Sequence, residues 1–211
     1  LLQGPMMDDA IGSVHATHMD PVWRAQMFGV WGNEPRGHDF HAAPFEIPMH
    51  GLGLFACRKD AWQGFSEHFR GFGGEEGYIH EKFRQSGART LCLPFLRWLH
   101  RFARPAGVPY ALTVNDKLRN YLIGWTELGL DVGPVLEHFK DQLPAPQLVA
   151  AVTSVRSLKI EPHRRATPIE AAFLDACRTP SDIHEHLPLL RKLASEVETV
   201  VEMGVRTGVS T

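Results

Sequence analysis

Residues 69–78 read FRGFGGEEGY and decide the interpretation of the chain. Two adjacent carboxylates, Glu75 and Glu76, follow a glycine-rich turn at the expected start of a helix. Glycine allows positive φ angles and lets the backbone approach a bulky ligand. The positive end of the helix dipole helps to keep a carboxylate ionised, as a general base or hydroxyl acceptor must be. The stretch therefore predicts either a catalytic acidic pair or an acidic first turn that only stabilises the helix.

Downstream, a helix is expected over residues 75–86, because its apolar residues recur one turn apart and Gly87 supplies a C-terminal cap. A strand is expected over residues 90–94. Residues 97–101 then read RWLHR, so His100 comes just beyond the end of that strand. An imidazole in this place suits a metal ligand or a phosphate contact, and a packed or surface histidine is the alternative.

Upstream, residues 51–57 read GLGLFAC, which predicts a buried strand. A short helix is expected to follow over residues 58–62. Residues 1–5 look like the tail of a strand that runs into a turn. The region up to about residue 40 predicts loops with scattered His, Trp, Gly and Pro.

The rest of the chain predicts four more helices, over residues 116–128, 135–141, 169–177 and 187–197. Prolines bracket a segment rich in Ser and Arg, which is expected to be a linker over residues 146–167. The expected domains are therefore residues 1–145 and residues 168–211. Both ends of the sequence read as cuts within a longer protein.

The order of these features resembles the acceptor-side, C-terminal half of glycosyltransferases with the GT-A fold, both family 2-like enzymes and the galactosyltransferase and N-acetylgalactosaminyltransferase group. Their hallmark turn is Gly-Gly-Glu-Asp or Gly-Gly-Glu-Asn, and Gly73, Gly74, Glu75 and Glu76 match it. The sequence departs in the second acidic residue and in Phe72, where the family usually has Trp. The Asp-x-Asp motif of the family is expected upstream of residue 1, and Asp8–Asp9 is interpreted as a turn.

The resemblance implies an α/β fold and transfer of a sugar from a nucleotide-sugar donor to a hydroxyl group of a saccharide or another acceptor, with Mn²⁺ or Mg²⁺. It implies that Glu76 is the base, that Glu75 orients the acceptor and that His100 binds the metal. Further substrate-binding residues are expected. Gly51 and Gly53 belong to the pocket floor, Gly73 and Gly74 to the acidic turn, and Trp98 supplies an aromatic side chain. Arg97, Arg101 and Arg104 are the cations expected near the diphosphate. Solvated charges are the alternative for the three arginines.

The C-terminal end carries a second resemblance. Residues 197–204 predict a strand, and Glu202, Gly204 and Gly208 are spaced as in the first motif of S-adenosylmethionine-dependent methyltransferases. In that motif the glycines let the cofactor lie against the backbone. Residues 168–211 are thus expected to begin a methyltransferase-like domain with a Rossmann fold.

Composition narrows the remaining choices. The 211 residues have a formal net charge of −2 and no basic block, so a nucleic acid is not an expected partner. The three cysteines lie far apart, which favours a reducing cytosol, and no signal peptide or apolar run of about 20 residues is visible. Five spaced histidines in the first 50 residues fit no closed zinc site. Two other functions stay open: a saccharide-binding module without catalysis, and the N-terminal region of a methyltransferase.

Overall fold

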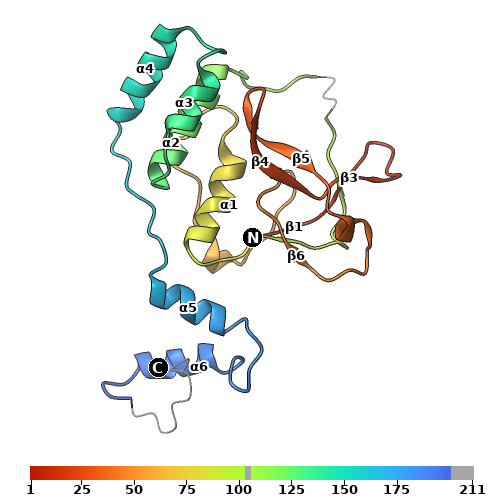
Figure 1. The fold of residues 1–211 in the computed structure, drawn as a ribbon, viewed down its shortest axis with the longest axis vertical. Helices are drawn as coiled ribbons and strands as arrows, with labels where there is room; N and C mark the ends of the chain where they lie inside the picture. Colours follow the sequence, from red (N-terminus) through yellow and green to blue (C-terminus); the bar gives the residue numbers. More distant parts are fainter. Residues whose placement is uncertain (103–105, 201–211) are drawn as a thin grey trace. The chain divides into compact units, whose positions relative to one another are not determined.

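The computed structural model describes residues 1–102 and 106–200, which form two compact units (Figure 1). The first unit comprises Leu1–Arg84 and Arg89–His163, and the second comprises Gln85–Ala88 and the chain from Arg164 onward. Helices and strands are mixed, so the chain belongs to the general α/β class that the sequence predicts.

The first unit holds two small three-stranded sheets. One has the order β1-β7-β6, in which β1 runs parallel to β7 and β6 antiparallel to it. The other has the order β3-β2-β8, in which β2 is parallel to β8 and antiparallel to β3. All six strands are short: β1 (Leu2–Gln3), β2 (Met6–Met7), β3 (Val14–Ala16), β6 (Phe45–Glu46), β7 (Leu91–Cys92) and β8 (Trp98–Leu99).

The loops predicted for the region up to about residue 40 are wrong in part, because residues 18–32 form a β-hairpin. Strand β4 (His18–Arg24) pairs with β5 (Met27–Gly32) in antiparallel register. Pro21 has no amide hydrogen for a sheet, and it lies where the register shifts between Asp20 and Trp23. Trp23 then packs against Tyr121 of the neighbouring helix, with ring centroids 4.8 Å apart.

Four helices complete the first unit: α1 (Glu75–Gln85), α2 (Val114–Glu127), α3 (Gly133–Phe139) and α4 (Ala145–Arg156). Helix α2 lies between α1 and α4 (Figure 1), and its buried face builds a core with Val135 and Phe139 of α3 and Val155 of α4. Thr113 caps α2 by accepting a hydrogen bond from the Asp116 amide at 3.0 Å. Gly129, at a φ of 63°, follows the end of the helix, as the sequence predicts.

A buried polar cluster joins α1 to the end of α2. The ammonium group of Lys82 lies 2.8 Å from a carboxylate oxygen of Glu127 and 2.6 Å from the hydroxyl of Tyr78. The same hydroxyl donates to Glu127 at 2.5 Å. Because all three groups are satisfied by one another, the cluster fixes the register of α1 along α2.

The second unit is built on α5 (Pro168–Ala176) and α6 (Leu187–Ser195), close to the predicted ranges. Thr167 and Glu170 form a reciprocal capping box at the start of α5. Gly87, at a φ of 75°, lies just beyond α1 as predicted, and its carbonyl accepts a hydrogen bond of 2.5 Å from Arg178.

Two further expectations differ from the structure. Residues 51–57 form turns instead of a strand, with one isolated bridge between Leu2 and Ala56. The segment 146–167, expected as a linker, is helical in its first half, because Pro144 and Pro146 stand at the helix start, where proline is tolerated. Helix α4 belongs to the first unit, which ends at His163.

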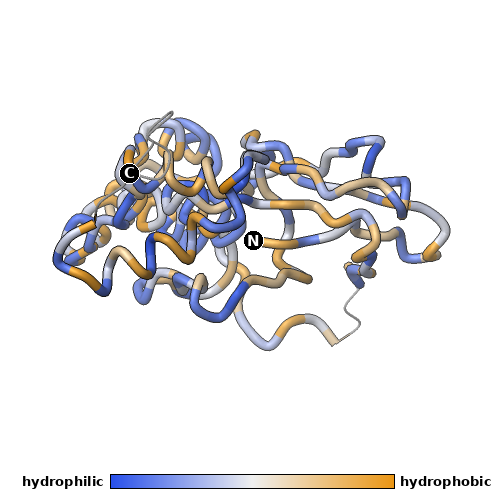
Figure 2. The backbone as a smooth tube through the Cα atoms, turned by 90° about the horizontal axis from the view of Figure 1, so that it is seen from below, coloured by the Kyte–Doolittle hydropathy of each residue, from blue (hydrophilic) through white to orange (hydrophobic). Residues whose placement is uncertain are grey.

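The other helices and strands expected between residues 1 and 196 agree with the structure within a few residues, and the short helix expected over residues 58–62 is a 3-10 helix over Lys59–Ala61. Hydrophobic and hydrophilic segments alternate along the tube in Figure 2. Within residues 1–102 and 106–200, no helix is both long enough and apolar enough to cross a membrane.

Candidate active site

The acidic turn forms as the sequence predicts. Gly73 and Gly74 have φ angles of 98° and 94°, in the region that favours glycine, and α1 begins directly after them at Glu75. A Cβ atom on Gly74 would lie 3.1 Å from Cβ of Asn120 and 3.3 Å from the backbone nitrogen of Tyr121. Both glycines are therefore required, for the backbone angle and for the close approach of α2.

Asn120 of α2 holds this turn in place. Its side-chain nitrogen donates hydrogen bonds to the carbonyl oxygens of Arg70 and Gly73, at 2.7 and 2.9 Å. Its side-chain oxygen accepts a bond of 3.1 Å from the backbone N–H of Arg70. Asn120 is only 2 % exposed, so a buried amide fixes the loop that delivers the two carboxylates.

The two carboxylates differ in burial. Glu76 is 8 % exposed and Glu75 is half-buried. Burial, followed by the charge of Glu75, raises the pKa of Glu76 to about 8. Burial also raises the pKa of Glu75, although the backbone of Glu75 and Gly73 and the charge of Lys117 oppose the rise. Near neutral pH, Glu76 therefore holds its proton more tightly than an ordinary carboxyl group, which disfavours two charges on the pair.

His80 connects the acidic turn to the segment around Gly51. Its Nδ1 atom lies 2.5 Å from the carbonyl oxygen of Glu76, and its Nε2 atom accepts a hydrogen bond of 3.2 Å from the backbone N–H of His50. Burial lowers the pKa of His80 to about 3 and that of His50 to about 4, so both rings are neutral at pH 7. Gln3 adds a donated bond of 2.7 Å to the carbonyl of Gly51.

Gly51 and Gly53 lie beneath indole rings. This close approach explains why both positions are glycine, although the segment forms no strand. A Cβ atom on Gly51 would lie 2.8 Å from the ring of Trp31, and one on Gly53 would lie 2.4 Å from the ring of Trp98. The Trp98 indole also donates a hydrogen bond of 2.8 Å to the carbonyl of Gly4. The expected pocket floor is thus a turn covered by aromatic rings.

His100 lies beside Gly53. A Cβ atom on Gly53 would be 3.3 Å from Cδ2 of His100. Its ring centroid is 4.2 Å from that of Phe102 and 5.8 Å from that of Trp98. These two ring neighbours of His100 are aromatic. The resemblance further predicts that His100 and Glu76 face one cleft.

The three arginines expected near the diphosphate lie in different surroundings. Arg97 donates a hydrogen bond of 2.8 Å to the carbonyl of His38, and its guanidinium lies over the ring of Phe40 at 5.7 Å. Arg101 is exposed, and Arg104 lies outside the described residues. Arg97 is therefore bound to the 38–40 segment in this structure.

Asp8 closes a surface turn, as predicted. Its carboxylate accepts hydrogen bonds from the amides of Gly12 and Ser13, at 2.9 and 3.1 Å, and from the Ser13 hydroxyl at 2.6 Å. The hydroxyl bond is the largest cause that lowers the pKa of Asp8. Within residues 1–102 and 106–200, no group of three or more His, Cys, Asp or Glu side chains is arranged to hold a metal ion.

Comparison with protein-family models, with curated proteins and with solved structures found no match. The resemblance to GT-A glycosyltransferases therefore rests on the motif and its spacing. The residues of the second resemblance, Glu202, Gly204 and Gly208, lie outside the described residues, and residues 197–200 belong to no strand.

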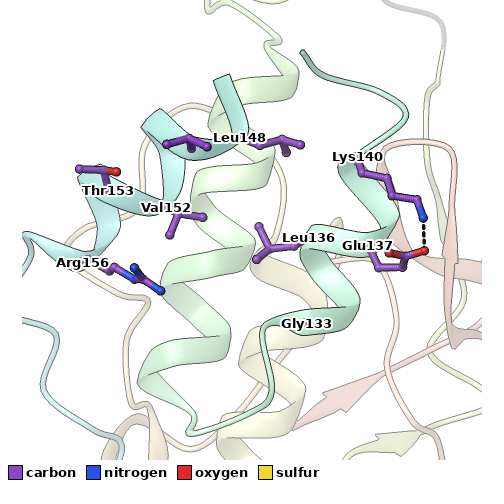
Figure 3. A pocket seen from close by; sticks show the side chains of 9 residues that line it. Gly133, Leu136, Glu137, Lys140, Leu148, Val152, Thr153 and Arg156 are labelled. Atoms are coloured by element: carbon purple, nitrogen blue, oxygen red, sulfur yellow. Dashed lines mark hydrogen bonds and ion pairs between the residues drawn. The ribbon is translucent and has the colours of Figure 1, made fainter. Parts of the chain in front are cut away.

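A separate groove of about 520 Å³ lies between α3 and α4 (Figure 3). Its walls are apolar at Leu136, Leu148 and Val152, and the Lys140–Glu137 ion pair stands at one side (Figure 3). None of the residues predicted for the active site lines this groove.

Sequence reasoning missed the supporting residues Asn120, Lys117 and His80. Asn120 and His80 carried a detectable signal, because each is a polar residue among the apolar positions of its helix. Lys117 carried no such signal, because a lysine in the first turns of a helix usually faces solvent. Only the structure shows that it is half-buried.

Proposed function

We propose that residues 1–145 act in a glycosyltransferase of the GT-A kind, which transfers a sugar from a nucleotide-sugar donor to an acceptor hydroxyl. The observation that carries the proposal is the acidic turn: two glycines with positive φ place Glu75 and Glu76 at the start of α1, and a buried amide locks the turn. An acidic pair that served only as a helix cap would need neither the lock nor the burial of Glu76.

The acidic pair supplies the proton chemistry. One carboxylate is ionised near neutral pH and accepts the proton of the acceptor hydroxyl, while the other, protonated, donates a hydrogen bond to an acceptor oxygen. The acceptor oxygen then forms a bond to the anomeric carbon, and the nucleoside diphosphate leaves with the electron pair of the broken bond. The resemblance gives the base to Glu76, and because the pKa values of both carboxyl groups are raised, we propose the base role for the pair.

Aromatic rings near Gly53 suit the sugar. Trp98 and His100 are half-buried, and Phe102 is exposed, as is the neighbouring Gly53. Apolar faces of sugar rings pack on aromatic side chains, while hydroxyl groups bind carboxylates. This arrangement supports a saccharide or a similar polyhydroxyl compound as the substrate.

The metal is the part of the proposal that rests on the resemblance alone. Aromatic rings surround His100, and the described residues contain no cluster of three ligands. These described residues do not make a complete site for Mn²⁺ or Mg²⁺. When bound, such an ion would neutralise charge on the departing diphosphate.

A saccharide-binding module is the second candidate, and the aromatic shelf of Trp98, His100 and Phe102 favours it. The transferase releases nucleoside diphosphate, whereas a saccharide-binding module does not. The full-length protein is incubated with nucleotide-sugars, saccharides and Mn²⁺, and nucleoside diphosphate release is measured. Saccharide binding without release in any combination would support the module and overturn the transferase.

Matched variants on α1 connect turnover to the acidic pair. Glu75→Gln and Glu76→Gln are expected to lower the transfer rate by roughly 10²- to 10⁴-fold, the usual contribution of general base catalysis. Glu81→Gln on the same helix changes a carboxylate that contacts Arg84 and lies outside the acidic turn, so it should keep the rate. Equal rates in all three variants would remove the acidic pair from the mechanism.

A further inference from the structure

The second unit contains a small polar pocket of about 120 Å³. Four segments of that unit form its walls: the loop after α1, the chain that leads into α5, α5 itself and α6. The lining residues are Ser86, Arg164, Ala166, Glu170, Leu174 and Arg191. One water molecule takes up about 30 Å³ in the liquid, so the pocket has room for about four waters or for one small oxyanion.

Contacts between these segments hold the walls together. The Ala166 N–H donates a hydrogen bond of 2.7 Å to the carbonyl oxygen of Gln85. Leu174 of α5 packs against Gly87, where an added Cβ atom would lie 2.6 Å from Cδ1 of Leu174. The pocket is therefore built by the packing of the second unit.

Arg164 and Glu170 form the compensated side of the pocket. The guanidinium of Arg164 donates a hydrogen bond of 2.7 Å to Oε1 of Glu170. The other carboxylate oxygen, Oε2, accepts a hydrogen bond of 2.9 Å from the backbone N–H of Thr167. Both oxygens of Glu170 are thus engaged, and its charge is balanced by that of Arg164.

Arg191 of α6 supplies the uncompensated charge. Its guanidinium lies over the ring of Phe173 at 4.8 Å from the centroid, a contact that positions it against α5. Within residues 1–102 and 106–200, no carboxylate forms an ion pair with Arg191. With two arginines and one glutamate in its lining, the pocket carries one net positive charge. A guanidinium presents a planar fork of N–H donors, which matches the oxygens of a phosphate group.

We propose that this pocket binds a phosphate-type oxyanion, either free phosphate or the phosphoryl group of a larger molecule, with Arg191 as its charged anchor. The inference goes beyond the proposed glycosyltransferase, because every lining residue belongs to the second unit. Size and charge support the same ligand: the pocket holds one small ion, and the charge in its lining attracts an anion.

The first test observes the Arg191 side chain directly. The 211-residue chain is labelled with ¹⁵N, and the Nε–Hε signal of Arg191 is assigned with Arg191→Met. Inorganic phosphate is then added at a constant ionic strength of about 0.15 M, at which surface charges are screened beyond about 8 Å. A saturable shift of the Arg191 signal is expected, and a signal that does not move overturns the proposal.

Three variants, observed through the backbone amide of Ser86, separate this site from diffuse surface charge. Arg191→Met should weaken phosphate binding by about tenfold or more, because it removes a charged hydrogen-bond donor. Lys192→Met removes the same charge from an exposed position outside the lining, and it should change the affinity by less than about twofold. Glu170→Gln keeps a side chain that caps α5 and removes the negative charge, so it should tighten binding.

Equal weakening in Arg191→Met and Lys192→Met would overturn the site, and so would an unchanged affinity in Glu170→Gln. Circular dichroism shows whether each variant folds. If Arg191→Met does not fold, Glu170→Gln still decides, because the proposal requires its affinity to rise.

Two further anions identify the source of the ligand and test its class. Phenyl phosphate that binds as tightly as inorganic phosphate, or more tightly, assigns the pocket to a phosphoryl group of a larger molecule. Weaker binding of phenyl phosphate assigns it to free phosphate. Acetate that binds as tightly as phosphate at the same ionic strength would overturn a phosphate-type ligand.

Discussion

Asn120 donates a hydrogen bond of 2.9 Å to the carbonyl oxygen of Gly73, 47 residues earlier in the chain. This bond spans from the middle of α2 to the turn that starts α1. The position of the acidic pair is therefore set by a residue outside the motif that contains it.

Asn120→Ala should lower the free energy of unfolding by about 2–3 kcal/mol, because it removes three hydrogen bonds to the backbone of Arg70 and Gly73, of which the one to Gly73 is buried. Urea denaturation measures the change. Asn115→Ala, at an exposed position of the same helix, is the control and should change stability little. Equal losses in both variants would show that the amide does not hold the turn.

Gly74→Ala should destabilise the protein more than Gly64→Ala. Both glycines have positive φ, 94° and 70°, so both variants incur the strain of that conformation, about 1 kcal/mol. Only at Gly74 does a new Cβ meet Asn120 and the backbone of Tyr121, whereas nothing lies within 4 Å at Gly64. Thermal unfolding of the two variants isolates the cost of the close approach, and a difference of zero would refute it.

Glu76 makes stability fall as the pH rises. Its pKa increases from an ordinary value of 4.5 to about 8 on folding, so the folded chain holds this proton more tightly than the unfolded chain. This contribution is complete below about pH 4.5 and is lost by about pH 8, with a slope of at most about 1.4 kcal/mol per pH unit. Glu76→Gln does not ionise, so its stability should decline less over this range. Parallel stability curves for the two proteins would contradict the burial of an ionisable group.

His80 has the opposite effect on the acid side. Burial lowers its pKa from 6.5 to about 3, so its contribution is complete above about pH 6.5 and is lost as the pH falls toward 3. His80→Gln should be less stable at pH 7 but lose less stability between pH 6.5 and 4. His41→Gln, at an exposed position, is the control and should follow the wild-type slope. Urea midpoints at several pH values provide the measurement.

His100→Ala should lower sugar transfer by the full-length protein while preserving the fold. The expectation comes from the position of His100 beside Gly53 and Trp98. Turnover is measured over a range of Mn²⁺ concentrations, with near-UV circular dichroism to verify packing. Turnover at the wild-type rate, with the same response to Mn²⁺, would remove His100 from the site.

The parts of the fold that the sequence predicted carry local signals. Helices α1 and α2 are each followed by a glycine with positive φ, Gly87 and Gly129. The end of each helix can therefore be predicted from neighbouring residues alone. The acidic turn was predictable for the same reason, since Gly73 and Gly74 are required by the turn itself.

The missed parts depend on distant partners. The β4–β5 hairpin contains a proline in β4 and two glycines in β5, and most of its residues are partly or fully exposed, so its own pattern favours loops. Gly51 and Gly53 alternate with leucines as in a strand, yet they are glycines because Trp31 and Trp98 pack on them. Lys117 and Asn120 matter only because the turn at Gly73 meets them across the fold.

The pairing of β1 with β7 has a consequence for the order of folding. Leu2 pairs with Leu91, and Gln3 with Cys92, so these strands meet only after about 90 intervening residues have been ordered or looped out. During synthesis, the first strand leaves the ribosome long before its partner exists. Helix α1 can form in the meantime from local contacts, and the sheet closes later. We therefore expect the slow step of folding at the strand pairing and not at the acidic turn.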